Sequence, residues 1–165
     1  MSFDFNADEI FQIGVQIEAN GQKFYETVAK NSSDPSAQKI FLDLARWESE
    51  HIEVFKKLRQ RLPDPAKREN LFDPNQEQHL YIKATADSHV FIRNKNIPEL
   101  ASECKTPIEA LDLAVTFEKD SVVFYTTMKK LVPEHLGKGE IDTLIDEEIS
   151  HIFILTQKKK ELEIK

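Results

Sequence analysis

Residues 44–55 read LARWESEHIEVF and residues 145–155 read IDEEISHIFIL, and both stretches contain the motif Glu-x-x-His. The first motif pairs Glu48 with His51, and the second pairs Glu148 with His151. Residues three apart on a helix share one face, so the glutamate and histidine of each pair are expected to point the same way. A lone motif of this kind means little in a chain with 29 acidic residues and five histidines. Two of them at equivalent positions are a stronger signal.

The two motifs belong to an internal repeat, which appears when the chain is shifted by 100 residues and laid on itself. The shift places each Glu-x-x-His motif on the other and also aligns the candidate helix caps Asn6 and Thr106. Such self-similarity predicts two copies of one helix hairpin, related by a pseudo-twofold axis. The other aligned pairs are Glu9 and Glu109, Val15 and Val115, Glu18 and Glu118, Phe24 and Phe124, Tyr25 and Tyr125, Leu44 and Leu144, and Ile52 and Ile152.

Apolar residues recur every three or four positions along four long segments, the spacing of an amphipathic helix. The segments run over about 7–30, 35–61, 107–131 and from 139 to the C-terminal lysines. Two pairs are typical helix starts: Asp34 before Pro35, and Thr106 before Pro107. The side chain of the first residue caps free backbone N–H groups, and proline lacks an N–H that would have no partner in the first turn. Prolines at 63, 65 and 133 are expected to end helices. No β pattern is found.

A long connection, about 62–106, separates the second and third helices. Antiparallel neighbours usually join through a few residues, whereas a parallel pair needs a return along a helix that is ~38 Å long for ~25 residues. Its middle, about 76–93, could form a short extra helix. The sequence therefore predicts an all-α, four-helix bundle with one long crossover, a known type. We expect one domain over 1–165, with helix hairpins at about 7–61 and 107–163.

Composition limits the partners and the compartment. The net charge is −7, and basic residues lie in short runs near acidic ones, so nucleic acids and anionic membranes are not expected as partners. No apolar run reaches the ~20 residues of a membrane span. The start, MSFDFNADEIFQ, lacks a secretory pattern, and Cys104 is the only cysteine, so no intramolecular disulfide can form. We expect a cytoplasmic protein.

Packing the two hairpins together would bring four carboxylates and two imidazoles to the bundle centre. Buried carboxylates repel one another and lose their hydration, and two divalent cations would offset both costs. Oxygen and nitrogen donors suit iron or manganese, and zinc could use the same ligands. The alternative to a metal site is that these residues lie on solvent-exposed helix faces. The candidate metal ligands, which are also the candidate catalytic residues, are Glu18, Glu48, His51, Glu118, Glu148 and His151.

The chain resembles the ferritin-like di-iron carboxylate superfamily, and within it the rubrerythrin-like proteins. The resemblance lies in IEANGQKFYETV (17–28), LARWESEHIEVF, FEKDSVVFY (117–125) and IDEEISHIFIL, which cover all four helices. It implies two iron ions per chain, bridged by Glu48 and Glu148. Glu18 and Glu118 would be terminal ligands, and His51 and His151 would bind one metal each.

The same resemblance implies an activity and its partners. The expected reaction is reduction of hydrogen peroxide or dioxygen with Fe(II), in a homodimer. Tyr25 and Tyr125 are expected to hydrogen-bond the metal ligands, as tyrosines near these positions do in the family. Core packing is the alternative role for both.

Three departures from the resembled proteins narrow these expectations. Ser121 occupies the position of a further glutamate that rubrerythrins usually carry. No Cys-x-x-Cys pair exists, so the rubredoxin domain of full rubrerythrins is not expected. Electrons are then expected from Fe(II) or from a separate donor such as a rubredoxin-type protein. Ser49 stands where bacterioferritins place a haem-binding methionine, so no haem is expected.

Other functions use the same ligands. These are a ferroxidase that handles stored iron, a di-iron hydroxylase, and a metal-free helical interaction module. Of the remaining residues, Trp47 is expected to pack. Three acids beside the motifs are expected to face water, and three histidines outside the repeat to lie on the surface or pack in the crossover. The acids are Glu50, Glu53 and Glu147, and the histidines are His79, His89 and His135.

Overall fold

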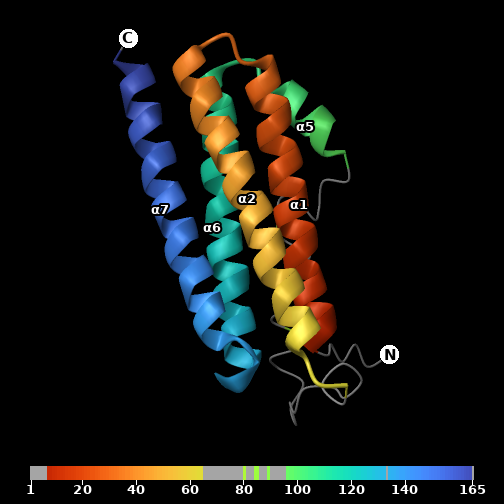
Figure 1. Ribbon diagram of the computed structural model, residues 1–165. Helices are drawn as coiled ribbons and strands as arrows, with labels where there is room; N and C mark the ends of the chain where they lie inside the picture. Colours follow the sequence, from red (N-terminus) through yellow and green to blue (C-terminus); the bar gives the residue numbers. More distant parts are fainter. Residues whose placement is uncertain are drawn as a thin grey trace.

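Four long helices run side by side in the computed structural model (Figure 1), which describes residues 7–64, 80, 84, 85, 89, 96–132 and 134–164. They are α1 (Ala7–Asn31), α2 (Pro35–Arg61), α6 (Pro107–Leu131) and α7 (Lys138–Glu163). A short helix α5 (Ile97–Glu103) and a 3₁₀ turn η2 (Glu134–Leu136) complete the described elements, which include no strand. The prediction of an all-α four-helix bundle is confirmed.

The chain runs up α1, down α2, down α6 and up α7 in the view of Figure 1. The second and third long helices are therefore parallel, as the length of the crossover predicted. α1 packs against α2 and α6 against α7, so each half of the repeat is a hairpin. Weaker contacts of α1 with α6 and of α2 with α7 close the bundle, and α5 covers α1.

Helix starts follow the capping chemistry in the sequence. Asp34 Oδ1 accepts from the Ala37 N–H at 2.7 Å at the start of α2. Thr106 and Glu109 form a reciprocal capping box at the start of α6. Helix α7 begins at Lys138, one residue before the prediction, after Gly137 with φ of 108°. A left-handed φ of this kind favours glycine.

Some predicted features lie outside the described residues. They are the cap at Asn6, the prolines Pro65 and Pro133, His79, and most of the expected helix at 76–93. In the crossover, α5 occupies the end of the segment, at 97–103, where no helix was predicted. Its start is capped by Asn96, whose side chain accepts from the Glu99 N–H. A proline at the second helical position fits because its missing N–H costs nothing there.

Aromatic side chains fill the core between the hairpins, and two glycines on α1 make room for them. A Cβ on Gly14 would lie 2.8 Å from the Phe55 ring, and one on Gly21 would lie 2.6 Å from Phe117. The Tyr25 ring stacks against Phe41 and meets Phe117 edge-on. The glycines thus set how closely α1 approaches α2 and α6.

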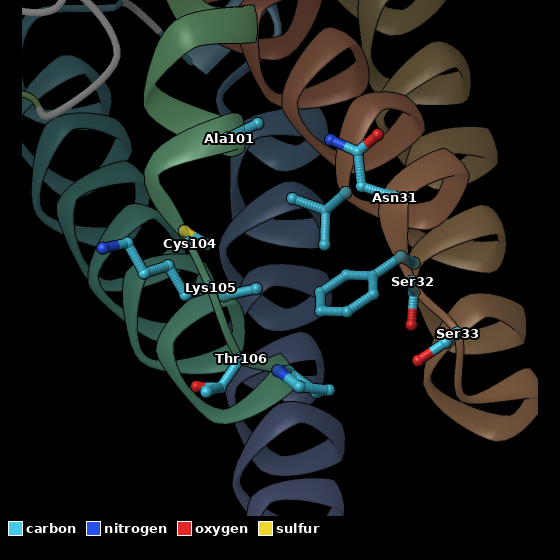
Figure 2. Close-up of a pocket in the computed structure, with 11 residues that line it drawn as sticks. Asn31, Ser32, Ser33, Ala101, Cys104, Lys105 and Thr106 are labelled. Atoms are coloured by element: carbon cyan, nitrogen blue, oxygen red, sulfur yellow. The ribbon is translucent and has the colours of Figure 1, made fainter.

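A small pocket lies at the end of the bundle where α1 turns into α2 (Figure 2). Cys104 lies on one wall, with Asn31 and Ser32 opposite, and none of the six candidate metal ligands lines it. Burial, together with Glu109 and Glu103, raises the pKa of the Cys104 thiol. This keeps the thiol protonated and unreactive. In the described part of the chain, no helix is both long and apolar enough to cross a membrane.

Gly21→Ala is expected to destabilise the protein by about 1–3 kcal/mol, because the added methyl group collides with the Phe117 ring in a packed core. Gly139→Ala is the control. Its Cβ would meet nothing within 4 Å, and alanine favours helices over glycine by about 1 kcal/mol. Urea unfolding of both variants measures the difference. Equal stability of the two variants would refute the close approach at Gly21.

Candidate metal centre

The six candidate ligands lie near the middle of the four long helices, on the faces that point into the bundle. All four glutamates have no exposed surface, and His51 and His151 are 2% and 4% exposed. Each first helix of a hairpin supplies one glutamate, and each second helix supplies a glutamate and a histidine one turn apart. The structure thus brings together all six residues that the repeat singled out. Their role as ligands stays a prediction.

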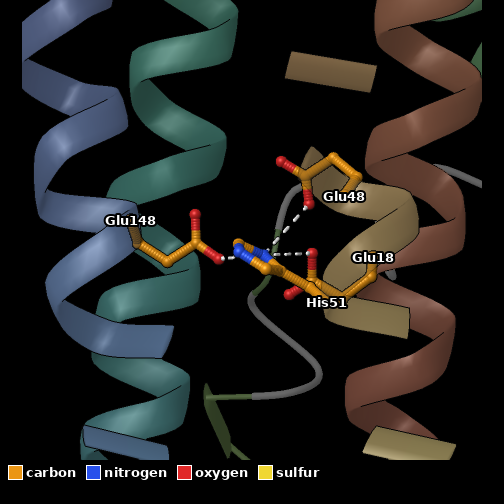
Figure 3. Close-up of side chains that lie close together, drawn as sticks. All are labelled: Glu18, Glu48, His51 and Glu148. Carbon is orange, nitrogen blue, oxygen red and sulfur yellow. Dashed lines mark hydrogen bonds and ion pairs between the residues drawn. The ribbon is translucent and has the colours of Figure 1, made fainter. Parts of the chain in front are cut away.

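The six residues form two overlapping groups, each able to offer four donor atoms within 4.8 Å of one another. Glu48 and Glu148 belong to both groups. Figure 3 shows the first group, in which Glu148 from α7 faces Glu18 and Glu48 across the imidazole of His51. Two groups that share two carboxylates have the geometry expected for two neighbouring cation positions. The first group is Glu18, Glu48, His51 and Glu148, and the second is Glu48, Glu118, Glu148 and His151.

Both histidines turn Nδ1 toward the carboxylates. Nδ1 of His51 lies 3.0 Å from Glu148 Oε1 and 3.3 Å from Glu18 Oε2. Nδ1 of His151 lies 3.0 Å from Glu148 Oε2 and 3.5 Å from Glu118 Oε2. The two rings stack at 5.6 Å between centroids. Nδ1 is therefore the atom that each imidazole offers to a cation, and Nε2 points away.

Two tyrosines bond the cluster across the hairpins. The hydroxyl of Tyr25 on α1 donates to Glu118 Oε1 on α6 at 2.5 Å. The hydroxyl of Tyr125 on α6 donates to Glu18 Oε1 on α1. Burial, with the nearby glutamates, raises the pKa of both phenols far above the usual value, so both keep the proton that they donate. Each tyrosine therefore fixes the orientation of one carboxylate of the opposite hairpin.

Several buried carboxylate oxygens accept no hydrogen bond. They are both oxygens of Glu48, Oε2 of Glu118 and Oε1 of Glu148. The last two lie within ion-pair distance of histidine nitrogens, but Glu48 comes no closer than 3.9 Å to His51 Nδ1. A buried acceptor without a partner costs about 1–3 kcal/mol, and more if charged. Divalent cations would satisfy these oxygens, so the residues fit a two-metal centre of oxygen and nitrogen donors.

Burial and the charges within the cluster shift the pKa values of its residues. Burial and Glu18 raise the pKa of Glu48, and burial and Glu148 raise that of Glu118. Burial alone would lower the histidine pKa values. The glutamates outweigh it and raise the pKa of His51 to about 12 and of His151 to about 10. Burial likewise opposes ionisation of Glu148, but the neighbouring Glu118 and both histidines lower its pKa.

Sequence reasoning missed two contacts on the outer side of the histidines. Glu147, expected to face water, is 51% exposed, yet its Oε2 lies 2.7 Å from His51 Nε2. Trp47 packs as expected, but its partner is the ring of His151, stacked at 4.9 Å. Residues 47 and 147 are equivalent in the repeat. That equivalence was the available signal, because it places both residues in the same position relative to the ligands.

His89 is buried in the crossover, one of the two places expected for it, and its contacts lie close to the cluster. It belongs to the crossover and is fully buried, and its Nε2 lies 3.1 Å from Ser121 Oγ. Its ring meets Phe117 edge-on at 5.4 Å. Burial lowers the pKa of His89 to about 3, so the imidazole is neutral. Packing in the crossover was expected, but a contact with Ser121, one turn beyond Glu118, had no sequence signal.

Comparison with known proteins agrees with this architecture. A model of the Rubrerythrin family matches residues 9–103, more than half of the chain. The curated proteins contain no match. A Thermotoga maritima protein described as a ferritin-like diiron-carboxylate protein has a TM-score of 0.70 at 22% identity, covering 98% of this chain and 99% of its own. A Pyrococcus furiosus protein described as hypothetical has a TM-score of 0.64 at 18% identity, covering 95% and 90%. These likenesses show the ferritin-like fold.

The metal-free protein is expected to lose stability as pH rises from about 6 to about 9. The folded state holds protons on Glu48, Glu118, His51 and His151 that the unfolded chain releases, and stability falls with pH wherever the folded state binds more protons. The histidine contribution is complete below the unfolded value of 6.5 and is lost as pH rises through the folded values. The lowered pKa of Glu148 acts only in acid.

Zinc-loaded protein should lack this loss, because the cation replaces the protons and binds better as they leave. Thermal melts followed by circular dichroism, with chelator or with zinc, measure the two pH profiles. Parallel profiles would contradict the assignment of these residues to a metal centre.

Proposed function

The chain belongs to the rubrerythrin family, and on that premise we propose that it is a di-iron oxidoreductase that reduces hydrogen peroxide. The observation that carries the proposal is the pair of overlapping four-residue groups that share Glu48 and Glu148. Glu48 and Glu148 would bridge two metal positions. Glu18 and His51 would complete one position, and Glu118 and His151 the other, so that each position has three carboxylates and one imidazole.

Iron suits both the ligands and the reaction. Carboxylate and imidazole donors bind first-row metals without thiolates. When bound, two Fe(II) ions would supply one electron each, and with two protons these convert one hydrogen peroxide molecule to two water molecules. The neutral Ser121 at the α6 position one turn beyond Glu118 adds no further carboxylate to the set.

The residues around the cluster restrict what can reach it. The ligands are at most 4% exposed, so a substrate must be small unless the helices separate. Tyr25 and Tyr125 hold Glu118 and Glu18 in place, so that two carboxylates keep one orientation. Neutral His89 packs against α6 through Ser121 and Phe117 and adds no charge beside the cations. Peroxide meets this size limit, and so does dioxygen.

The electrons must come from outside the described site. The chain has one cysteine and so lacks the paired thiolates of a rubredoxin-type centre. We therefore propose that a separate electron donor returns the oxidised metal to the ferrous state. A catalytic cycle is then expected only when protein, peroxide and donor are present together.

Two iron ions per chain are expected after anaerobic loading, and Glu148→Ala should lose both, because Glu148 belongs to both groups. Glu50→Ala removes a carboxylate two residues from Glu48 that is 67% exposed, and should keep both irons. Iron determination on desalted protein measures the content. Two irons in Glu148→Ala would contradict a shared ligand.

Ferrous protein mixed anaerobically with peroxide should oxidise at least about ten times faster than protein mixed with dioxygen. Stopped-flow absorbance of the ferric product measures both rates, with the Glu50→Ala variant as a control for surface charge. Faster oxidation by dioxygen would favour ferroxidase or oxygen chemistry over peroxide reduction. Slow oxidation by both would end the proposal.

A further inference from the structure

One pair of equivalent residues beside the ligand histidines differs between the two halves of the metal centre. Position 47 precedes the ligand Glu48 on α2, and position 147 precedes the ligand Glu148 on α7. Each of these residues contacts the histidine of the other hairpin: Trp47 contacts His151, and Glu147 contacts His51. The repeat thus keeps the contact but changes its chemistry from an indole to a carboxylate.

Glu147 acts on the nitrogen of His51 that faces away from the cluster. Its Oε2 lies 2.7 Å from Nε2, while Nδ1 faces Glu148 and Glu18. If Nδ1 binds a cation, the imidazole proton lies on Nε2, and this N–H donates a hydrogen bond to the Glu147 carboxylate. Such a contact fixes the ring and its tautomer, and it makes the imidazole a stronger donor to the metal.

Trp47 acts on His151 through the ring face. The indole and imidazole planes are 10° from parallel, with centroids 4.9 Å apart. A stacked indole shields the ring from water but brings no negative charge to Nε2. The ligands of the two positions are alike, with three carboxylates and one histidine in each group. The carboxylate on His51 is therefore a negative charge that the contact of Trp47 with His151 does not supply.

We propose that Glu147 is a positioning residue that makes the two metal positions unequal, so that the His51 position fills first and binds more tightly than the His151 position. The inference rests on the proposed function, since it requires a two-metal centre. It deepens that function by giving the order of loading. The negative charge of Glu147 beside His51 also makes this position the one that better stabilises a more highly charged cation.

Titration of the metal-free full-length protein with Co(II) alone tests the order without any peroxide chemistry. Calorimetry and visible absorption of bound cobalt should show two steps, with affinities at least about tenfold apart. His51→Ala should remove the tight step, and His151→Ala the weak step. Glu147→Gln keeps a side chain of the same shape without the charge. It should weaken the tight step by about 10- to 100-fold and leave the weak step unchanged.

Asp146→Asn is the matched control, because it removes the same charge one residue away and should leave both steps unchanged. Trp47→Glu gives the converse test and should strengthen the weak step toward the tight one.

Three results would overturn the inference while leaving the metal centre in place. They are two equal steps in the natural chain, an unchanged tight step in Glu147→Gln, and equal weakening in Glu147→Gln and Asp146→Asn. No bound cobalt in the natural chain would overturn the inference and the proposed function together.

Discussion

Burial of four carboxylates at one point in the bundle is the constraint on which the rest of the structure depends. An ion removed from water costs several kcal/mol, and like charges at short distance add to that cost. The described structure offsets part of the cost in two ways: tyrosine hydroxyls donate to Glu18 and Glu118, and histidines lie beside Glu148. Burial and neighbouring carboxylates also raise the pKa of Glu48 and Glu118, which favours their neutral forms. Four carboxylate oxygens still accept no hydrogen bond. A pair of cations at this point would offset the negative charge and would also give these oxygens a partner.

The way the two hairpins pack brings the buried carboxylates, histidines and tyrosines together. Each hairpin contributes half of the centre, and each tyrosine bonds a glutamate of the other hairpin, so neither half is complete alone. Helices α2 and α6 run parallel, and the two hairpins lie side by side (Figure 1). Gly14 and Gly21 let the aromatic rings of α2 and α6 pack directly on α1 above and below Glu18. Packing, topology and site are therefore parts of one arrangement.

The parts of the fold that could be predicted from the sequence depend on local chemistry or on the repeat. Asp34, Thr106 and Glu109 mark helix starts because capping involves residues three apart. Glu48, His51 and their repeat partners could be assigned to one cluster because equivalent positions in a twofold repeat converge. Contacts made across the bundle were harder to predict from the sequence. Glu147 resembled a surface acid, and its bond to His51 depends on how α2 and α7 pack. His89 comes from an irregular crossover, where no periodicity relates it to Ser121.

The central claim is that six side chains from four helices enclose two cations. X-ray diffraction from crystals grown anaerobically with Fe(II), with data collected at the iron absorption edge, tests it most directly. The account predicts two anomalous peaks inside the bundle, both contacted by Glu48 and Glu148, with His51 on one and His151 on the other. No peak at the bundle centre, or iron bound only by acids on the outer surface, would contradict it.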